Sequence, residues 1–237
     1  MGLALIALSA LFYLLHYMIF RDARHIFIYL IGDIAFVFIE VLLVTLVVHG
    51  LLTYREKKAL LKKLNMVIGA FFSEVGTDLI KFIKKLDPDS AKISKDLIVT
   101  KEWSDKEFAK IRRLAVSHAG NINLDSFDLN DMRNFLIKKR EFLLSLLGNP
   151  NLLEHESFTN LLWAVFHLME ELLNRGDLKN LPDKDREHLS GDIKRVRGLI
   201  ITEWLNYMSH LSKDYPYLFS LAMRTNPFDA NASVEIK

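Results

Sequence analysis

Residues 26–52, IFIYLIGDIAFVFIEVLLVTLVVHGLL, form an apolar stretch of membrane-spanning length whose acidic side chains are Asp33 and Glu40. About 20 apolar residues in a helix cross a hydrocarbon core of about 30 Å. A carboxylate at that depth costs about 2.5–3.5 kcal/mol on insertion scales, so its presence there is by default a hypothesis about function. The stretch therefore predicts a membrane span and marks the part of the span in which to look for function.

A second apolar stretch, residues 2–20, contains no charged side chain and is also long enough to span a bilayer. It is followed by Arg21 and Arg24 rather than by the small-residue cleavage site of a signal peptide, and no basic residue precedes it. Residues 21–25 are too few for a domain, so the two stretches are expected to form an antiparallel helical hairpin. We predict that both stretches span the membrane within a hairpin of residues 1–54.

Basic residues near the ends of the spans predict the orientation of the hairpin. Two of them lie in the connecting loop, whereas five closely follow the second span. The positive-inside rule places the end with more Lys and Arg in the cytosol, so we predict two spans with both termini cytosolic. The five residues, which are also expected to contact anionic lipid headgroups, are Arg55, Lys57, Lys58, Lys62 and Lys63.

The remainder of the chain, residues 55–237, is long enough for one compact cytosolic domain with its own core. The formal net charge of the full chain is only +2, which does not indicate a nucleic-acid partner. The chain has no cysteine, so disulfides, thiolate metal sites and cysteine nucleophiles are excluded. The composition therefore indicates a small membrane anchor that carries a larger folded domain.

Helical spacing of apolar residues continues after the second span and predicts that residues 55–87 extend the same helix to Asp87-Pro88. A kink near Gly50 is expected as readily as a continuous helix. Capping and stop signals predict further helices, and there is no β-hairpin signal. The sequence thus predicts an all-α integral membrane protein with a transmembrane hairpin and a cytosolic helical bundle. The further helices are expected over residues 104–118, 128–147, 152–175, 182–213 and 215–224, with Gly191 and Gly198 as weak points.

Asp33 and Glu40 are seven residues apart, which places them within about 20° of each other on one face of a helix. Counted from the hairpin loop, Tyr13 and His16 come near the depth of Asp33, where either could donate a hydrogen bond to it. In one interpretation the acids are protonated or paired and serve helix association. In a second, several hairpins surround an axis and the acids form stacked rings that favour cations. A third is a proton relay or a contact with another membrane protein.

The cytosolic domain lacks the common enzyme motifs. It has no Gly-rich dinucleotide or phosphate-binding loop, no Gly-x-Ser-x-Gly and no His-Glu-x-x-His. His167 with Glu171, and His188 with Asp192, are i, i+4 pairs that a helix could offer to a metal. Such pairs are more often surface contacts or packed histidines, and the Glu-x-x-His pattern of di-iron bundles is absent. We therefore predict neither a metal nor a cofactor.

Two aromatic regions are expected to pack in the domain. Trp163, Phe166 and Met169 are interpreted as core residues, which would turn Glu171 outward. The aromatic ending, residues 215–228, is expected to dock on the domain or on a neighbouring subunit, because large apolar groups are unfavourable in water. Beyond it we expect loose packing.

Two further groups of basic residues could converge on an anionic ligand from mid-helix positions. A solvated helix face is the more common role of such groups. A bound ligand could bias the spanning helices through the connecting helix. The groups are Lys138, Lys139 and Arg140, and Lys194, Arg195 and Arg197.

A single hairpin cannot enclose an aqueous path, so a pore requires several copies of the chain. The sequence therefore favours a homo-oligomeric membrane protein that conducts a cation past Asp33 and Glu40, with the cytosolic domain as an assembly or gating module. The alternative is a membrane-tethered scaffold or signalling adaptor whose bundle binds a protein partner or an anionic ligand. An enzyme without a familiar motif is the third interpretation.

Overall fold

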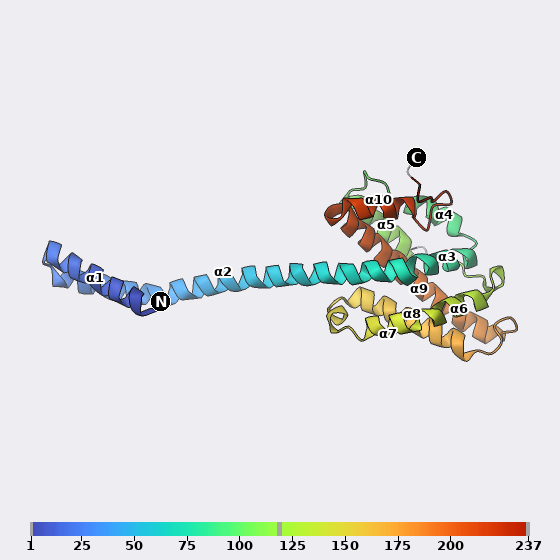
Figure 1. Ribbon diagram of the computed structural model, residues 1–237, viewed down its shortest axis with the longest axis horizontal. Coiled ribbons are helices and arrows are strands. Elements are labelled where there is room, and N and C mark those ends of the chain that lie inside the picture. The colour runs from blue at the N-terminus through green and yellow to red at the C-terminus, as the bar shows by residue number, and fades with distance from the viewer. Residues whose placement is uncertain (1, 118–119, 236–237) are drawn as a thin grey trace. The chain divides into compact units, whose positions relative to one another are not determined.

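The computed structural model describes residues 2–117 and 120–235, except for the side chains of residues 61, 126, 153 and 154. Within these ranges every regular element is a helix (Figure 1), which confirms the predicted all-α fold class. The α-helices are α1 (Gly2–Phe20), α2 (Ala23–Phe71), α3 (Thr77–Leu86), α4 (Ser90–Ser94), α5 (Asp105–Ser117), α6 (Leu129–Lys138), α7 (Arg140–Leu147), α8 (Glu156–Asn174), α9 (Asp183–Asp214) and α10 (Pro216–Arg224). The other elements are the π-helix η1 (Phe72–Gly76) and the 3-10 helices η2 (Lys95–Leu97), η3 (Leu124–Ser126) and η4 (Pro150–Glu154).

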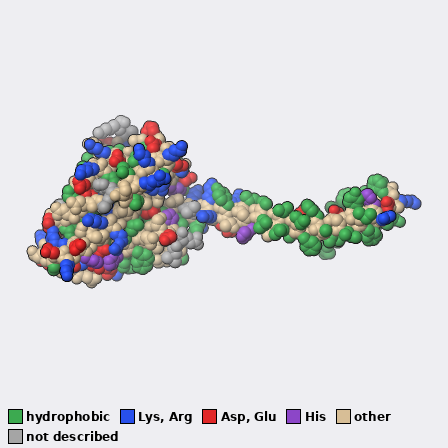
Figure 2. All heavy atoms as spheres, turned by 180° about the vertical axis from the view of Figure 1, so that it is seen from behind, with side chains coloured by type: hydrophobic (Ala, Val, Ile, Leu, Met, Phe, Trp, Pro, Cys, Tyr) green, Lys and Arg blue, Asp and Glu red, His purple; other side chains and the backbone are tan. Residues whose placement is uncertain are grey.

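The chain divides into two compact units, Met1–Ala59 and Leu60–Lys237. No described side chain of the first unit is buried, although Figure 2 shows hydrophobic side chains along much of it. By length and composition alone, α1 and α2 are suitable to cross a membrane. The apolar surface of the first unit is therefore left uncovered by the rest of that unit.

A tight reversal joins α1 to α2. Arg21 takes a left-handed backbone conformation, with φ of 50°, and its N–H donates to the carbonyl of Tyr17 at 2.9 Å. The carboxylate of Asp22 then accepts a hydrogen bond of 3.1 Å from the N–H of His25 and so caps the start of α2. These two contacts turn the chain between its two apolar helices.

α2 is unbroken at Gly50, so the helix continues through this glycine. The helical run ends at Leu86, where the sequence predicted its end, but η1 interrupts the α-helical pattern. Thr77 Oγ1 donates to the carbonyl of Phe72 across this segment at 2.8 Å. A Cβ atom at Gly76 would lie 2.5 Å from Cδ1 of Phe72, so the glycine makes room for the aromatic ring.

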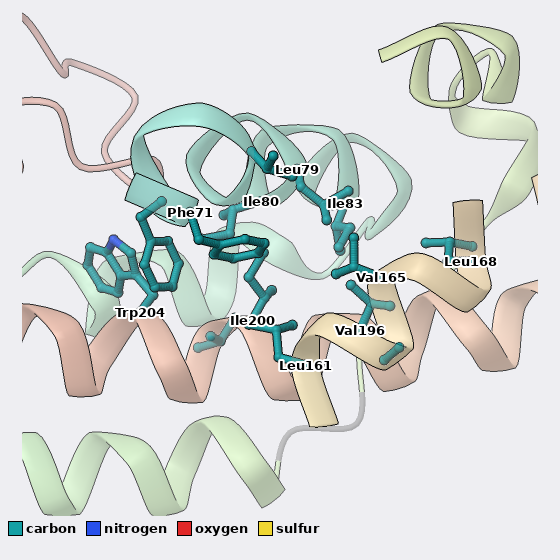
Figure 3. Packing of buried hydrophobic residues seen from close by; sticks show 14 of the residues in the cluster. Phe71, Leu79, Ile80, Ile83, Leu161, Val165, Leu168, Val196, Ile200 and Trp204 are labelled. Carbon is teal, nitrogen blue, oxygen red and sulfur yellow. The ribbon is translucent and has the colours of Figure 1, made fainter. Parts of the chain in front are cut away.

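The core of the second unit is built around α9, which packs against α3, α5, α8 and α10, while α6 and α7 pack on α8. Figure 3 shows Ile80 of α3, Val165 of α8 and Ile200 of α9 together in this core. All three side chains are buried. Phe71 adds an edge-to-face contact with Phe158, with ring centroids 5.3 Å apart.

The predicted capping signals start helices where the sequence placed them. Ser104 N–H donates to Glu107 Oε2 at 2.7 Å, and Glu107 N–H donates to Ser104 Oγ at 3.4 Å, so the capping box forms. Asp128 caps α6 by accepting a hydrogen bond of 2.9 Å from Asn130 N–H. The predicted end of the helix from residue 104, at His118, lies outside the described residues.

Helix continuity departs from the sequence prediction at two places. The single helix predicted over residues 128–147 is wrong, because Lys139 (φ −99°, ψ 3°) separates α6 from α7. Conversely, α9 continues through Gly191 and Gly198. Packing against four other helices offsets the roughly 1 kcal/mol that a glycine costs in a helix interior.

A buried ion pair connects the end of α3 to α9. Arg197 Nε donates to Asp87 Oδ2 at 3.0 Å, and both side chains are almost fully buried. Asp87 Oδ1 also accepts the backbone N–H groups of Asp89 at 3.0 Å and of Asn121 at 3.4 Å. Gly120 has a φ of +65°, and a Cβ atom there would lie 2.9 Å from the guanidinium carbon of Arg197. The pair thus joins three stretches that are distant in sequence.

The C-terminal segment docks on the same unit, as predicted for its aromatic residues. Phe228 is buried and packs edge-on against Trp204, with ring centroids 5.1 Å apart. The residues that follow are held more closely than expected, since Arg224 Nη1 donates to the carbonyl of Val234 at 3.0 Å. The ending is therefore part of the domain surface.

Arg197→Met should lower the free energy of unfolding by about 3–5 kcal/mol, because it leaves the buried Asp87 without its counter-charge. Lys194→Met removes an exposed cation from the same helix and should change the stability by no more than about 0.5 kcal/mol. Thermal and denaturant unfolding of the full-length protein in detergent, followed by circular dichroism, measures both. Equal effects of the two substitutions would contradict the role assigned to the ion pair.

Candidate functional site

Asp33 and Glu40 are exposed in the single chain and share one face of α2 by helical geometry. Tyr13 and His16 line a hollow together with His25. The imidazole rings of His16 and His25 stack with centroids 5.9 Å apart. Asp33 is not among the residues that line this hollow, so a hydrogen bond from Tyr13 or His16 to Asp33 stays a prediction.

The first predicted basic group lies at the junction of α6 and α7 rather than in mid-helix. Lys138 is exposed. Lys139 Nζ lies 2.8 Å from Glu74 Oε2, and Arg140 Nη2 lies 3.6 Å from Glu170 Oε1. Two of the three cations are thus paired with separate carboxylates of the same chain.

The second basic group does not present its three cations together. Lys194 is exposed, and Arg195 Nη1 lies 3.1 Å from Asp192 Oδ1. Arg197 is buried against Asp87 and is a structural ion-pair residue. Neither alternative that the sequence left open for Arg197, a solvated helix face or convergence with its neighbours on an anionic ligand, holds, because its side chain is buried in the core.

The basic residues that follow the second apolar stretch are all exposed, and their contact with lipid headgroups stays a prediction. They are Arg55, Lys57, Lys58, Lys62 and Lys63.

Four side chains that the sequence presents as two separate pairs meet at the surface of the second unit. His167 and Glu171 come from α8, and His188 and Asp192 come from α9, which packs beside it. Potential ligand atoms of His167, Glu171 and His188 all lie within 4.8 Å of one another. Asp192 Oδ2 lies 3.4 Å from His167 Nε2 and 3.3 Å from His188 Nε2. We call these four residues the histidine–carboxylate cluster.

Two arginines hold the carboxylates of this cluster. Arg195 Nη1 donates to Asp192 Oδ1 at 3.1 Å, and Arg175 Nη1 donates to Glu171 Oε2 at 2.5 Å. Arg175 also donates to both carboxylate oxygens of Asp185, at 2.9 and 2.7 Å. The second oxygen of Asp192, Oδ2, faces both histidines. The second oxygen of Glu171, Oε1, lies 3.8 Å from His167, whereas the oxygen held by Arg175 lies 3.7 Å from His188.

The structure corrects the predicted orientation of α8. Met169 is buried, but Trp163 is 56% exposed rather than part of the core, and Phe166 is only half-buried. Glu171, expected to face outward, lies at the border with α9 and contacts its residues. Trp163 lies roughly opposite the buried stripe, at about 100° per residue around the helix. That stripe consists of Leu161, Val165, Leu168 and Leu172.

Hydrogen bonding from Arg175 holds the pKa of Glu171 below its ordinary value of 4.5. Such a carboxylate stabilises the fold above its unfolded pKa, and this contribution is lost as the pH falls through its lower folded pKa. Glu171→Gln should therefore lower stability at neutral pH by about 1–2 kcal/mol, and its difference from the native chain should shrink towards pH 3. Unfolding midpoints of both proteins across this range test it. A difference that does not change with pH would contradict the assignment.

The two units correspond to two matched regions of one family. Residues 60–224 match "Uncharacterized protein MJ1433, C-terminal helical domain", and residues 1–52 match "MJ1433, N-terminal helical domain". "Uncharacterized protein MJ1433" of Methanocaldococcus jannaschii is 49% identical over 236 residues, which cover 100% of this chain and 94% of that protein. No solved structure matches the chain. The chain therefore belongs to the MJ1433 family and contains both of its helical domains.

Proposed function

We propose that this chain is a two-span integral membrane protein that assembles from several copies and conducts a cation past Asp33 and Glu40. In this proposal residues 2–20 and 26–52 cross the bilayer and both termini are cytosolic. Residues 55–237 serve as an assembly or gating domain. The observation that carries the proposal is the position of two carboxylates on one exposed face of an unbroken apolar helix.

The uncovered apolar surface of the first unit supports insertion into a bilayer. Leu3 is 85% exposed and Phe38 is 74% exposed, and both belong to long helices with no buried side chain among residues 2–59. Soluble monomers rarely expose continuous apolar surface of this extent. Helices satisfy their own backbone hydrogen bonds, so lipid can surround them without leaving polar groups unpaired.

The two carboxylates support assembly around an axis. In hydrocarbon each of them needs a polar partner or water, because a charged side chain at the bilayer centre is costly. Rings of Asp or Glu contributed by several subunits provide that surrounding and favour cations. Because Asp33 and Glu40 are seven positions apart, their rings would lie about 10 Å apart along the helix.

The pathway is tested by neutralising both acids in Asp33→Asn with Glu40→Gln. Cation flux into liposomes that contain the purified full-length protein should fall at least about tenfold, because the ring charge that attracts cations is removed. Glu56→Gln is the matched control, since it removes an exposed acid just beyond the second apolar stretch and should leave flux unchanged. Unchanged flux in the double variant, with an unchanged assembly mass, would contradict the proposed pathway.

The assembly itself is tested by the mass of the full-length protein in nanodiscs. Four or more copies would support a central path. A monomer would contradict the channel and favour the alternative, a membrane-tethered scaffold or adaptor whose helical domain binds a protein partner or an anionic ligand.

A further inference from the structure

The histidine–carboxylate cluster has the chemistry and the spacing of a metal site. We propose that His167, Glu171, His188 and Asp192 bind a divalent transition-metal cation of the Zn²⁺ class at the surface of the helical domain. The ligand set is two imidazole nitrogens and two carboxylates, drawn equally from α8 and α9. The site is separate from the proposed cation path and does not depend on it.

The spacing of the ligand atoms agrees with tetrahedral coordination. Zn²⁺ has nitrogen and oxygen ligands at about 2.0–2.2 Å, so two tetrahedral ligand atoms lie about 3.3–3.6 Å apart. Asp192 Oδ2 lies 3.4 and 3.3 Å from the Nε2 atoms of His167 and His188. Glu171 approaches the same nitrogens, with Oε1 3.8 Å from His167 and Oε2 3.7 Å from His188. These two distances involve different oxygens of Glu171, so coordination of one ion by both histidines and one Glu171 oxygen requires this carboxylate to rotate.

Asp192 provides an independent indication that the cluster has a ligand. Its side chain is only 4% exposed, and its Oδ2 atom has no hydrogen-bond partner among the described residues. That atom lies 3.4 and 3.3 Å from the Nε2 atoms of His167 and His188, but neither contact has the geometry of a hydrogen bond. Because a buried carboxylate oxygen without a partner is destabilising, a cation at this position would supply the missing interaction.

The residues around the cluster orient its ligands in the manner of an outer coordination shell. Arg195 holds Asp192 through Oδ1, and Arg175 holds Glu171 through Oε2. Asp192 is thereby fixed with Oδ2 towards both histidines, and Glu171 is fixed with Oε1 towards His167. Outer-shell hydrogen bonds of this kind set the orientation of metal ligands. Asp185 accepts two hydrogen bonds from Arg175 and so offsets part of the positive charge beside the site.

The donor atoms select among cations. Imidazole nitrogen is a good ligand for Zn²⁺ and other first-row transition metals, whereas Mg²⁺ and Ca²⁺ prefer oxygen ligands alone. The His167 and His188 side chains are 45% and 54% exposed, so the ion has access from solvent. The geometry therefore fits a solvent-accessible transition-metal site better than a hard-cation site.

Equilibrium dialysis of the full-length protein in detergent against Zn²⁺, after chelator treatment, tests the proposal. The native chain should retain about one more Zn²⁺ per chain than His167→Gln/His188→Gln. Each single histidine variant should weaken Zn²⁺ binding at least about tenfold. Loss of an outer-shell partner already weakens metal binding by about that factor, and loss of a ligand should weaken it at least as much. Mg²⁺ at the same concentration should not displace Zn²⁺.

Asp214→Asn is the matched control. Asp214 forms an i, i+4 pair with His210 on the same helix, with 2.9 Å between Oδ2 and Nδ1, but no second pair among residues 2–117 and 120–235 groups with it. This variant should bind Zn²⁺ like the native chain. Equal Zn²⁺ retention by the native chain and the double histidine variant, or an equal loss in Asp214→Asn, would overturn the proposal.

A second measurement needs only the native chain and so does not depend on the folding of any variant. Co²⁺ replaces Zn²⁺ in tetrahedral sites and then absorbs visible light far more strongly than in octahedral solution. Addition of Co²⁺ should produce strong bands that Zn²⁺ abolishes. A weak octahedral spectrum that Zn²⁺ does not alter would count against the site.

Discussion

The buried ion pair between Asp87 and Arg197 is the constraint on which the helical domain depends. Removing two charges from water is costly, and the cost is offset only when geometry and further hydrogen bonds satisfy both groups. Here Asp87 accepts from Arg197 and from two backbone N–H groups, and Gly120 permits the close approach. Because this arrangement has one geometry, it fixes the position of α9 relative to the end of α3. Asp192 lies five residues before Arg197 on α9, about 7.5 Å along the axis, so the ion pair also fixes where the histidine–carboxylate cluster can form.

Features of the fold that depend on neighbouring residues could be predicted from the sequence, and features that depend on packing could not. The capping box of Ser104 and Glu107 and the cap at Asp128 are local hydrogen bonds, so the sequence contains all that they need. The break at Lys139 follows no helix-stop signal, and the π-helix η1 involves contacts of Gly76 and Thr77 with Phe72 that the helix-stop rules do not describe. α9 shows the reverse case, since its contacts with four helices keep it continuous through two glycines.

The sequence predicts the two residue pairs of the candidate cluster but not that the pairs meet. Both i, i+4 pairs were recognised, but each alone is a common surface arrangement, and their meeting depends on how α8 and α9 pack. The orientation of α8 was the missing information. Interpreting Trp163 as a core residue turned Glu171 outward, whereas the stripe that includes Leu161 and Leu168 places Glu171 beside α9. The 3.6-residue period itself favours this stripe, because its leucines and valine recur at three and four residues.

Both proposals start from carboxylates that the chain does not satisfy internally. Arg197 and Asp87 complete each other, so their burial contributes to the fold and needs no external partner. Asp192 Oδ2 differs, because it is buried beside two imidazoles without a hydrogen bond. Asp33 and Glu40 would also lack partners if α2 lies in a bilayer as proposed, because lipid supplies neither hydrogen bonds nor counter-charge. In both cases a cation satisfies carboxylates that the single chain leaves incomplete, which is why the two proposals follow from one physical requirement.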